Sequence, residues 1–380
     1  MSRSDDAARR RALELWLGQH LPGPVEIGGL TRPGAGQSSE TFLFEAKSTA
    51  RDPMPLVLRM QAGAGHIFPQ PDAVLESRVL EGVAESGKVA VPKVIAAEED
   101  PTILGAPFFV MEQVAGRVPQ GKPSLHAGGW VADMAPEGRR HLWEQAMAML
   151  VAVHGVPWRR THTFLDPASA PAPDRLSCRI DWLAGWYRWA ARDREYPVID
   201  AGLEHLRSNR PALPESEDAL VWGDARVGNM IFADDASVAA AVDWEVATVG
   251  RPEIDLAHWL FFDEFATDAV GVPRLDGWPD RNATIRRYQE LSGRTLFDLG
   301  YFDIMQELFM AVTLIRQSDR RVEKGLSAPD SRMGHDNTVT QMLARRLGLP
   351  VPDLSPDWLA HRGVTPSGAG VSGRRAGGAA

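Results

Sequence analysis

The strongest constraint on the fold is a change in sequence character near Gly116. Before it, short apolar runs alternate with glycine- and proline-rich turns, as in strands, apart from a first helix expected over Ser4–Gln19 and helical spacing over Asp72–Glu85. Beyond it, helical spacing dominates. The sequence therefore predicts an α+β chain, with a small sheet and an inserted helix over residues 1–115 and a larger, mainly helical part over residues 116–349.

The composition is that of an ordinary globular protein, with 44% hydrophobic and 24% charged residues in a chain of 380. The formal net charge of −9 argues against a nucleic-acid partner, because such proteins present a basic surface. No apolar run approaches the roughly 20 residues that a membrane-spanning helix needs, and the N-terminus lacks the apolar core of a signal peptide. We therefore expect a soluble, cytoplasmic protein without a membrane or nucleic-acid partner.

Three minor features complete this picture. Cys178 is the only cysteine, which excludes an intramolecular disulfide and a cysteine-based zinc cluster. Proline, glycine, serine and alanine dominate residues 350–380, which predicts a flexible C-terminal tail. The histidines His66, His154 and His258 lack metal-ligand spacing, so we interpret each as structural.

The most informative segment interrupts the helical part. It runs L-V-W-G-D-A-R-V-G-N-M-I-F over Leu220–Phe232, and A-V-D-W-E follows from Ala241. Asp224 stands five positions before Asn229, and Asp243 follows the next apolar run. Phosphoryl transfer needs a group that accepts the proton of the attacking hydroxyl, and hard oxygen ligands that hold magnesium on the nucleotide phosphates. An aspartate, an asparagine and a second aspartate at adjoining strand ends supply these groups.

This segment resembles the catalytic and metal-binding segments of aminoglycoside phosphotransferase-type kinases, distant relatives of protein kinases, which carry H-G-D-x-x-x-x-N followed by D-[FWLI]-[EDG]. It is most similar to the branch fused to, or encoded beside, acyl-CoA dehydrogenases, and the similarity extends over roughly residues 25–345. The resemblance implies a protein-kinase-like two-lobed fold, with a small antiparallel-sheet N-lobe and a larger, mainly helical C-lobe that holds the catalytic loop and the acceptor cleft.

The resemblance also implies roles for the residues of this segment. Asp224 would be the catalytic base, Asn229 and Asp243 the magnesium ligands, and Glu245 a nearby metal or outer-shell group. Asp255 would brace the catalytic loop by hydrogen bonding.

One residue departs from the family pattern, because Trp222 replaces the usual histidine. Trp222 either packs beneath the loop, which we favour, or lines the acceptor pocket and selects the substrate.

The nucleotide side is predicted from the first lobe. The turn P-G-A-G-Q-S-S-E that begins at Pro33 could cover the phosphates. Arg59 stands at the position of the kinase lysine, and its expected partner is Glu76, with Glu81 or Arg78 as competitors. Met111 would pack near the base. The remaining predicted nucleotide contacts are Gly34, Gly36, Gln37 and Ser38 of the turn, and main-chain groups of Glu112, Gln113 and Val114.

The resulting prediction is an ATP- and magnesium-dependent O-phosphotransferase for a small hydroxylated molecule. The sequence does not separate ATP from GTP, identify the acceptor or give the oligomeric state. The rival hypothesis is a catalytically silent nucleotide-binding or scaffolding module, motivated by Trp222 and Arg59.

Several acceptors stay open: an aminoglycoside or macrolide antibiotic, a choline-like amino alcohol, and a hydroxyacyl-CoA. An acidic run (Asp263, Glu264, Asp268) could serve a polycation, although we favour a solvated face. The aromatic helix Ile180–Arg192 is interpreted mainly as core or groove wall, with a cage for a quaternary ammonium as the minor alternative.

Overall fold

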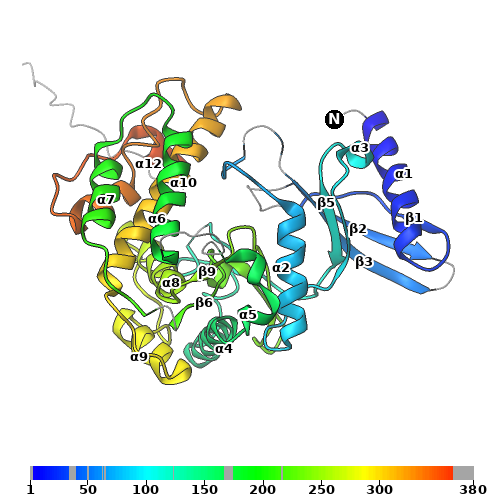
Figure 1. Ribbon diagram of the computed structural model, residues 1–380, viewed down its shortest axis with the longest axis horizontal. Coiled ribbons are helices and arrows are strands. Elements are labelled where there is room, and N and C mark those ends of the chain that lie inside the picture. The colour runs from blue at the N-terminus through cyan, green and yellow to red at the C-terminus, as the bar shows by residue number, and fades with distance from the viewer. Residues whose placement is uncertain are drawn as a thin grey trace, which may run out of the picture.

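The computed structural model describes residues 3–33, 40–48, 51–61, 63, 66–122, 124–166, 174–214 and 217–362. The predicted glycine-turn contacts Gly34, Gly36, Gln37 and Ser38 lie outside these residues. The chain forms two lobes, with the sheet at one end of the molecule and most helices at the other (Figure 1).

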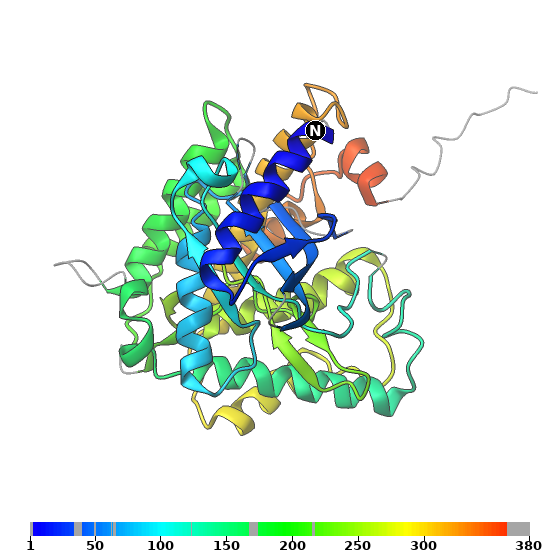
Figure 2. The ribbon, with the colours of Figure 1, turned by 90° about the vertical axis from the view of Figure 1, so that its right-hand side faces the viewer.

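The N-lobe is an antiparallel sheet of strand order β1-β2-β3-β5-β4, covered by a helix on each face. On the outer face, α1 crosses the strands (Figure 2) and packs Leu13 and Leu17 against Leu56 and Leu58. The elements are α1 (Arg3–His20), β1 (Val25–Ile27), β2 (Glu40–Ser48), β3 (Arg51–Met60), α2 (Ala73–Ser86), β4 (Val94–Glu98), α3 (Pro101–Leu104) and β5 (Phe108–Glu112).

Alternation along β3 positions a functional side chain. Leu56 and Leu58 face α1, so Arg59 points to the opposite face, where α2 lies. α2 begins at the N-cap Asp72, whose side chain accepts from the Leu75 N–H, and ends at the left-handed Gly87. Arg59 therefore meets the first turn of α2.

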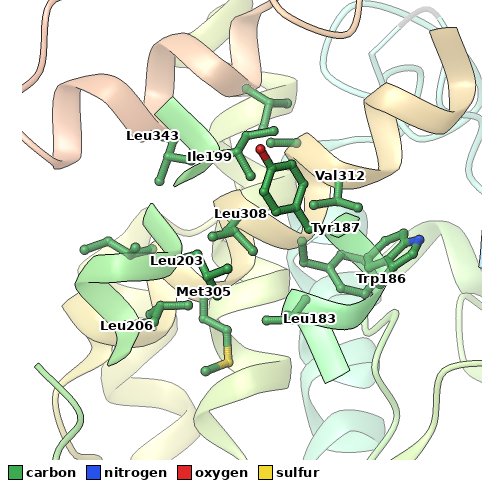
Figure 3. Close-up of a cluster of buried hydrophobic side chains, with 14 of the residues drawn as sticks. Leu183, Trp186, Tyr187, Ile199, Leu203, Leu206, Met305, Leu308, Val312 and Leu343 are labelled. Atoms are coloured by element: carbon green, nitrogen blue, oxygen red, sulfur yellow. The ribbon is translucent and has the colours of Figure 1, made fainter. Parts of the chain in front are cut away.

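The C-lobe is built around the long helix α10, which packs against α6, α7, α8 and α11. Figure 3 shows part of this core, where Leu308 and Val312 of α10 meet Leu203 and Leu343. Its helices are α4 (Pro136–His154), α5 (Trp158–Thr161), η1 (Thr163–Leu165), α6 (Arg175–Ala191), α7 (Pro197–Ser208), α8 (Glu253–Ala266), η4 (Asp268–Val270), α9 (Arg281–Ser292), α10 (Leu299–Glu323), α11 (Thr338–Arg346) and α12 (Pro356–Arg362).

Two short antiparallel strand pairs interrupt these helices. β6 (Ala219–Val221) pairs with β9 (Thr248–Gly250), and β7 (Met230–Phe232) pairs with β8 (Val238–Ala241). The 3-10 turn η3 (Val227–Asn229) precedes β7. The predicted polar residues therefore lie in the connections between these strands.

Part of the segment over residues 350–380, predicted as a flexible tail, is helical. Residues Pro356–Arg362 form α12, and its Trp358 is only 2% exposed. The Trp358 indole donates to Thr338 Oγ1 (2.9 Å) and packs with the core of the C-lobe. One buried aromatic side chain thus anchors a segment whose overall composition suggests flexibility. Among the described helices, none is both long and apolar enough to cross a membrane.

Candidate active site

Asp224 follows β6 and is held by two side chains. Its Oδ1 accepts from His258 Nε2 of α8 (2.6 Å) and from Arg226 Nε (3.0 Å). Burial by itself would raise the pKa of Asp224, but the Arg226 charge and the His258 hydrogen bond outweigh burial and hold that pKa well below the usual carboxyl range. Asp224 is therefore ionised at neutral pH, as a proton acceptor must be.

Asn229 and Asp243 are tied to Asp224 through backbone contacts. Asn229 Nδ2 donates to the Asp224 carbonyl (2.9 Å), and the Val242 N–H donates to the Asn229 carbonyl (3.0 Å). Asp243 itself has a φ of 67°, in the left-handed region that few residues other than glycine adopt. Such backbone strain is typical of functional sites. The structure thus brings together the three residues that the sequence selects.

Arg59 joins the two lobes at this place. Its Nε donates to Glu76 (2.8 Å), its Nη2 pairs with Asp243 (2.5 Å), and Glu245 lies 3.9 Å from the same nitrogen. Burial alone would lower the pKa of Arg59, but the three carboxylates outweigh it and raise the pKa above its usual value. Glu76 is thus the partner of Arg59, as expected, and neither Glu81 nor Arg78 takes its place.

Asp255 of α8 braces the catalytic loop from below. It is fully buried, and its two carboxylate oxygens accept from the N–H groups of Trp222 (2.7 Å) and Gly223 (2.7 Å). His154 Nε2 lies 3.0 Å from the same carboxylate. Gly223 has a φ of 89°, and a Cβ there would lie 2.4 Å from the Val246 carbonyl oxygen. The loop therefore requires both this carboxylate and this glycine.

Replacing Asp255 with alanine should lower the free energy of unfolding by about 3–5 kcal/mol, because it leaves buried donors without their charged acceptor. Urea unfolding of the variant would measure this loss. The matched control is Asp268→Ala, which removes an exposed carboxylate just beyond the same helix and should change stability by about 0.5 kcal/mol or less. Equal effects of the two substitutions would contradict the bracing role.

Trp222 packs beneath the loop. It is fully buried, stacks on Trp244 with ring centroids 5.2 Å apart, and donates its indole N–H to the carbonyls of Val242 (3.2 Å) and Asp243 (3.1 Å). The indole thus holds the strained Asp243 backbone. Because Trp222 is buried, the alternative that it lines the acceptor pocket is wrong.

Two substitutions separate the packing of Trp222 from its hydrogen bonds. Trp222→Ala should cost about 3–5 kcal/mol of stability through the cavity that it leaves. Trp222→Phe keeps a ring but leaves two carbonyls without their donor, which should cost about 1–3 kcal/mol. Thermal unfolding of both variants would check the order. A Trp222→Phe protein as unstable as Trp222→Ala would show that the indole N–H matters more than the packing.

The hinge, residues 112–114 between the two lobes, already uses some of its main-chain N–H groups in hydrogen bonds to the N-lobe. The N–H of Glu112 donates to the Lys93 carbonyl and that of Gln113 to the Pro55 carbonyl, each at 2.9 Å. Carbonyl oxygens and the N–H of Val114 thus remain as main-chain groups that could meet a purine in the described part of the hinge. Met111 lies partly buried against the neighbouring core.

The donor set fits a magnesium ion. Asn229 uses its amide nitrogen on Asp224, which leaves its amide oxygen as a ligand, and Asp243 and Glu245 are both partly accessible. The described residues contain no group of three histidine, cysteine or acidic side chains that could hold a metal. Magnesium usually takes one or two carboxylates and completes its shell with phosphates and water. Asp243 and Asn229, with Glu245 nearby, could hold it in this way.

A cavity of about 120 Å³ lies beside the catalytic loop. Its aromatic wall is continuous with the groups that hold Asp224, because the Phe262 ring lies 5.1 Å from the Arg226 guanidinium carbon and 4.9 Å from the His258 ring. Residues lining the cavity include Arg226, Val227, Gly228, Trp259, Phe262, Phe265 and Trp278. The lining also includes the polar side chains of His126, Asp263 and Arg362, so the cavity combines aromatic walls with charged groups.

The acidic run is mostly engaged within the protein. Asp263 pairs with Arg274 and accepts from Trp278 Nε1 (3.0 Å), while Glu264 lies 3.6 Å from Arg346. The Glu264 side chain is still 36% accessible and Asp268 is exposed, so the solvated face that we expected is found at these two residues and not at Asp263.

The aromatic helix is core and groove wall, as expected. Trp186 and Tyr187 are buried, whereas Trp182 and Trp189 are more accessible. Both accessible rings already face a cation of the protein, Arg179 over Trp182 (4.5 Å) and Arg316 over Trp189 (4.6 Å). These contacts leave little room for the cage that a quaternary ammonium would need.

Sequence reasoning missed His258 and Arg226, the two side chains that hold Asp224. His258 was interpreted only as structural, yet it is fully buried and contacts the predicted base. A signal was present, because His258 stands three residues after Asp255 and so shares its face of α8. The face that braces the loop also reaches Asp224.

Comparisons with known proteins agree with this geometry. The model of the phosphotransferase enzyme family matches residues 29–291. Acyl-CoA dehydrogenase family member 10 of Mus musculus is 30% identical over 279 residues, which cover 73% of this chain and only 24% of that protein. The chain therefore spans about a quarter of the length of that relative.

Solved structures give the same result for the fold. A putative aminoglycoside phosphotransferase from Ralstonia eutropha superposes with a TM-score of 0.67 at 23% identity, covering 89% of this chain and 98% of its own. A thermostable aminoglycoside phosphotransferase, in a ternary complex with ADP and hygromycin B, gives 0.54 at 15% identity, covering 88% and 98%. The predicted kinase-like fold is confirmed.

Proposed function

Because the chain belongs to the phosphotransferase enzyme family, we propose that it transfers the γ-phosphate of ATP to a hydroxyl group of a small molecule, with magnesium as the metal. Membership confirms the predicted family and class of enzyme. The proposal is best supported by one observation: Arg59 of the N-lobe sheet meets Asp243, which is tied through Val242 and Asn229 to Asp224.

In the proposed reaction, a bond forms between the acceptor oxygen and the γ-phosphorus, and the bond to the bridging oxygen breaks, so that ADP leaves. The hydroxyl proton passes to Asp224, whose lowered pKa keeps it ionised beforehand. His258 and Arg226 hold the Oδ1 atom, which fixes the direction of the carboxylate toward the acceptor. Arg59 would bind the phosphates through Nη2, the guanidinium nitrogen that pairs with Asp243.

Magnesium, when bound, would neutralise charge on the phosphates that Asp243 and Asn229 face. In the structure, Asp243 Oδ1 accepts a hydrogen bond from Arg59 Nη2. The nucleotide is proposed on the same geometry, with Met111 and the main chain of residues 112–114 beside the base. The solved neighbour that binds ADP is consistent with this assignment.

Nucleotide binding separates the enzyme from the silent-module hypothesis. ATP with magnesium should raise the melting temperature of the protein, since a ligand that binds only the folded state stabilises it by mass action. Asp243→Asn should lose the part of the increase that depends on magnesium, whereas ATP alone should still act through Arg59. No response to ATP or GTP, with or without magnesium, would favour a scaffolding module.

A further inference from the structure

Among the described residues, no carboxylate forms an ion pair with Arg179, a partly buried cation near Asp224. Arg179 of α6 places its guanidinium carbon 4.5 Å from the ring centroid of Trp182 and 5.6 Å from that of Phe309. Its Nε is buried and finds no hydrogen-bond partner in the part of the chain that the structure describes. Burial lowers the pKa of Arg179 to about 10, while the charge of Asp255 acts in the opposite direction.

Two buried arginines of the C-lobe are paired with a carboxylate, whereas a third, Arg139, donates to the Ala132 carbonyl. Arg251 donates twice to Glu253 (2.8 and 3.1 Å), and Arg316 donates to Asp319 (2.9 Å). Burying an unpaired cation is costly, because it loses hydration without gaining a counter-charge. A planar guanidinium in such a place is suited to bind a carboxylate or phosphoryl group bidentately.

Arg179 is one aromatic ring away from the catalytic group. The Phe309 ring of α10 lies between it and His258, with a centroid distance of 6.0 Å to the His258 ring. His258 in turn donates to Asp224. Phe309 is only 4% exposed, whereas Arg179 and Asp224 are both partly accessible, so an acceptor that extends past this ring could contact both.

Resting on the proposed function, we propose that Arg179 binds an anionic group of the phosphate acceptor while the hydroxyl of that acceptor lies at Asp224. The acceptor class is then a hydroxylated organic anion with an apolar skeleton, because the partly accessible rings of Trp182 and Phe262 supply aromatic walls. Polycationic acceptors do not fit, since the accessible rings already face arginines and the carboxylates of Asp263 and Glu264 are paired.

The test uses acceptors that share one carbon skeleton and differ in charge. Hydroxy acids, hydroxyalkyl phosphates, the methyl esters of the acids, and the matching amino alcohols are each assayed for ADP release with ATP and magnesium. Binding of each is measured by calorimetry with a non-hydrolysable ATP analogue and magnesium present, which fills the phosphate site near Arg59. Comparison of the carboxylate and phosphate arms decides which anion Arg179 prefers.

We expect at least tenfold higher kcat/KM for an anionic arm than for the esters or amino alcohols. Arg179→Gln should raise KM for the anions tenfold or more, with little change in kcat or for the esters, and Arg179→Lys should restore part of the preference. The control Arg188→Gln removes an exposed arginine of the same helix and should leave KM unchanged. The melting temperature of Arg179→Gln should not fall, because the substitution removes an unpaired charge.

Three outcomes would overturn the inference: equal use of neutral or cationic acceptors, failure of every anionic member to bind while the nucleotide analogue binds, or an unchanged charge preference in Arg179→Gln. A purely structural Arg179 would lower the melting temperature without altering that preference. If the nucleotide itself does not bind, the proposed function fails instead, so the two failures are distinguishable.

Discussion

Asp243→Ala should lower phosphoryl transfer by on the order of a thousandfold. Loss of the main metal carboxylate removes several kcal/mol of charge stabilisation at the phosphates, and each 1.4 kcal/mol is about tenfold in rate. The substitution leaves Arg59 paired with Glu76, so the lobes should stay joined. The measurement is ADP release at saturating ATP over a magnesium titration, with an acceptor from the panel described above.

Two companions make this prediction specific. Asp243→Asn removes the charge but tolerates the left-handed backbone at this position better than alanine does, so it should also fail while keeping wild-type stability. Asp234→Ala removes an exposed carboxylate in the nearby β7–β8 turn and should be silent. Near wild-type transfer by Asp243→Asn would rule out Asp243 as the metal ligand.

Asp224→Asn should lower transfer by about 10²–10⁴-fold, the usual contribution of a general base. An amide has nearly the shape of the carboxylate, and its oxygen can still accept from His258 and Arg226, so the loop should keep its position. Binding of ATP and magnesium should be preserved. KM for the acceptor should change much less than kcat, since the lost interaction belongs to the transition state.

Substitutions of His258, which positions Asp224, test the same role indirectly. His258→Phe deletes the 2.6 Å hydrogen bond and should reduce kcat, whereas His258→Gln can restore a donor and should recover part of it. Misplacing a catalytic group by about 1 Å can cost on the order of a hundredfold. An inactive Asp224→Asn enzyme with a fully active His258→Phe enzyme would show that the base needs no positioning by α8.

Much of the site was predictable because it is local in sequence. Asp224, Asn229 and Asp243 stand at fixed spacings around two short strands, and the chain brings them together without distant help. The Arg59–Glu76 pair was expected from the resemblance to kinases, and the alternation of β3 and the first turn of α2 place the two side chains together.

Residues brought to the site from afar were not predictable in the same way. A lone histidine such as His258 has no motif, and its importance depends on how α8 packs under the loop. The surroundings of Arg179, where the described residues place aromatic rings and no paired carboxylate, likewise form only when α6, α8 and α10 pack together. The N–H groups of Glu112 and Gln113 donate to the carbonyls of Lys93 and Pro55, which are distant in sequence. Sequence spacing cannot indicate such long-range hydrogen bonds.

Two helices show the limits of reading periodicity alone. α7 was not predicted, although Ile199, Leu203 and Leu206 recur at helical spacing, because the proline-rich flanks suggest a loop. α12 was assigned to a tail because its surroundings are rich in proline and glycine, yet the buried Trp358 helps to anchor it. In both segments, burial of a few large side chains against α10 and its neighbours outweighs local composition.

The most direct measurement follows the γ-phosphate itself. ATP labelled with ¹⁸O on that phosphate is incubated with magnesium, the acceptor panel and the protein, and mass spectrometry detects labelled phosphate esters. We predict a labelled ester with the wild-type chain, none above background with Asp243→Asn, and about 10²–10⁴-fold less with Asp224→Asn. Ester formation that survives both substitutions, or nucleotide binding with no ester from any hydroxylated acceptor, would contradict the assignment of these residues as a phosphotransfer centre.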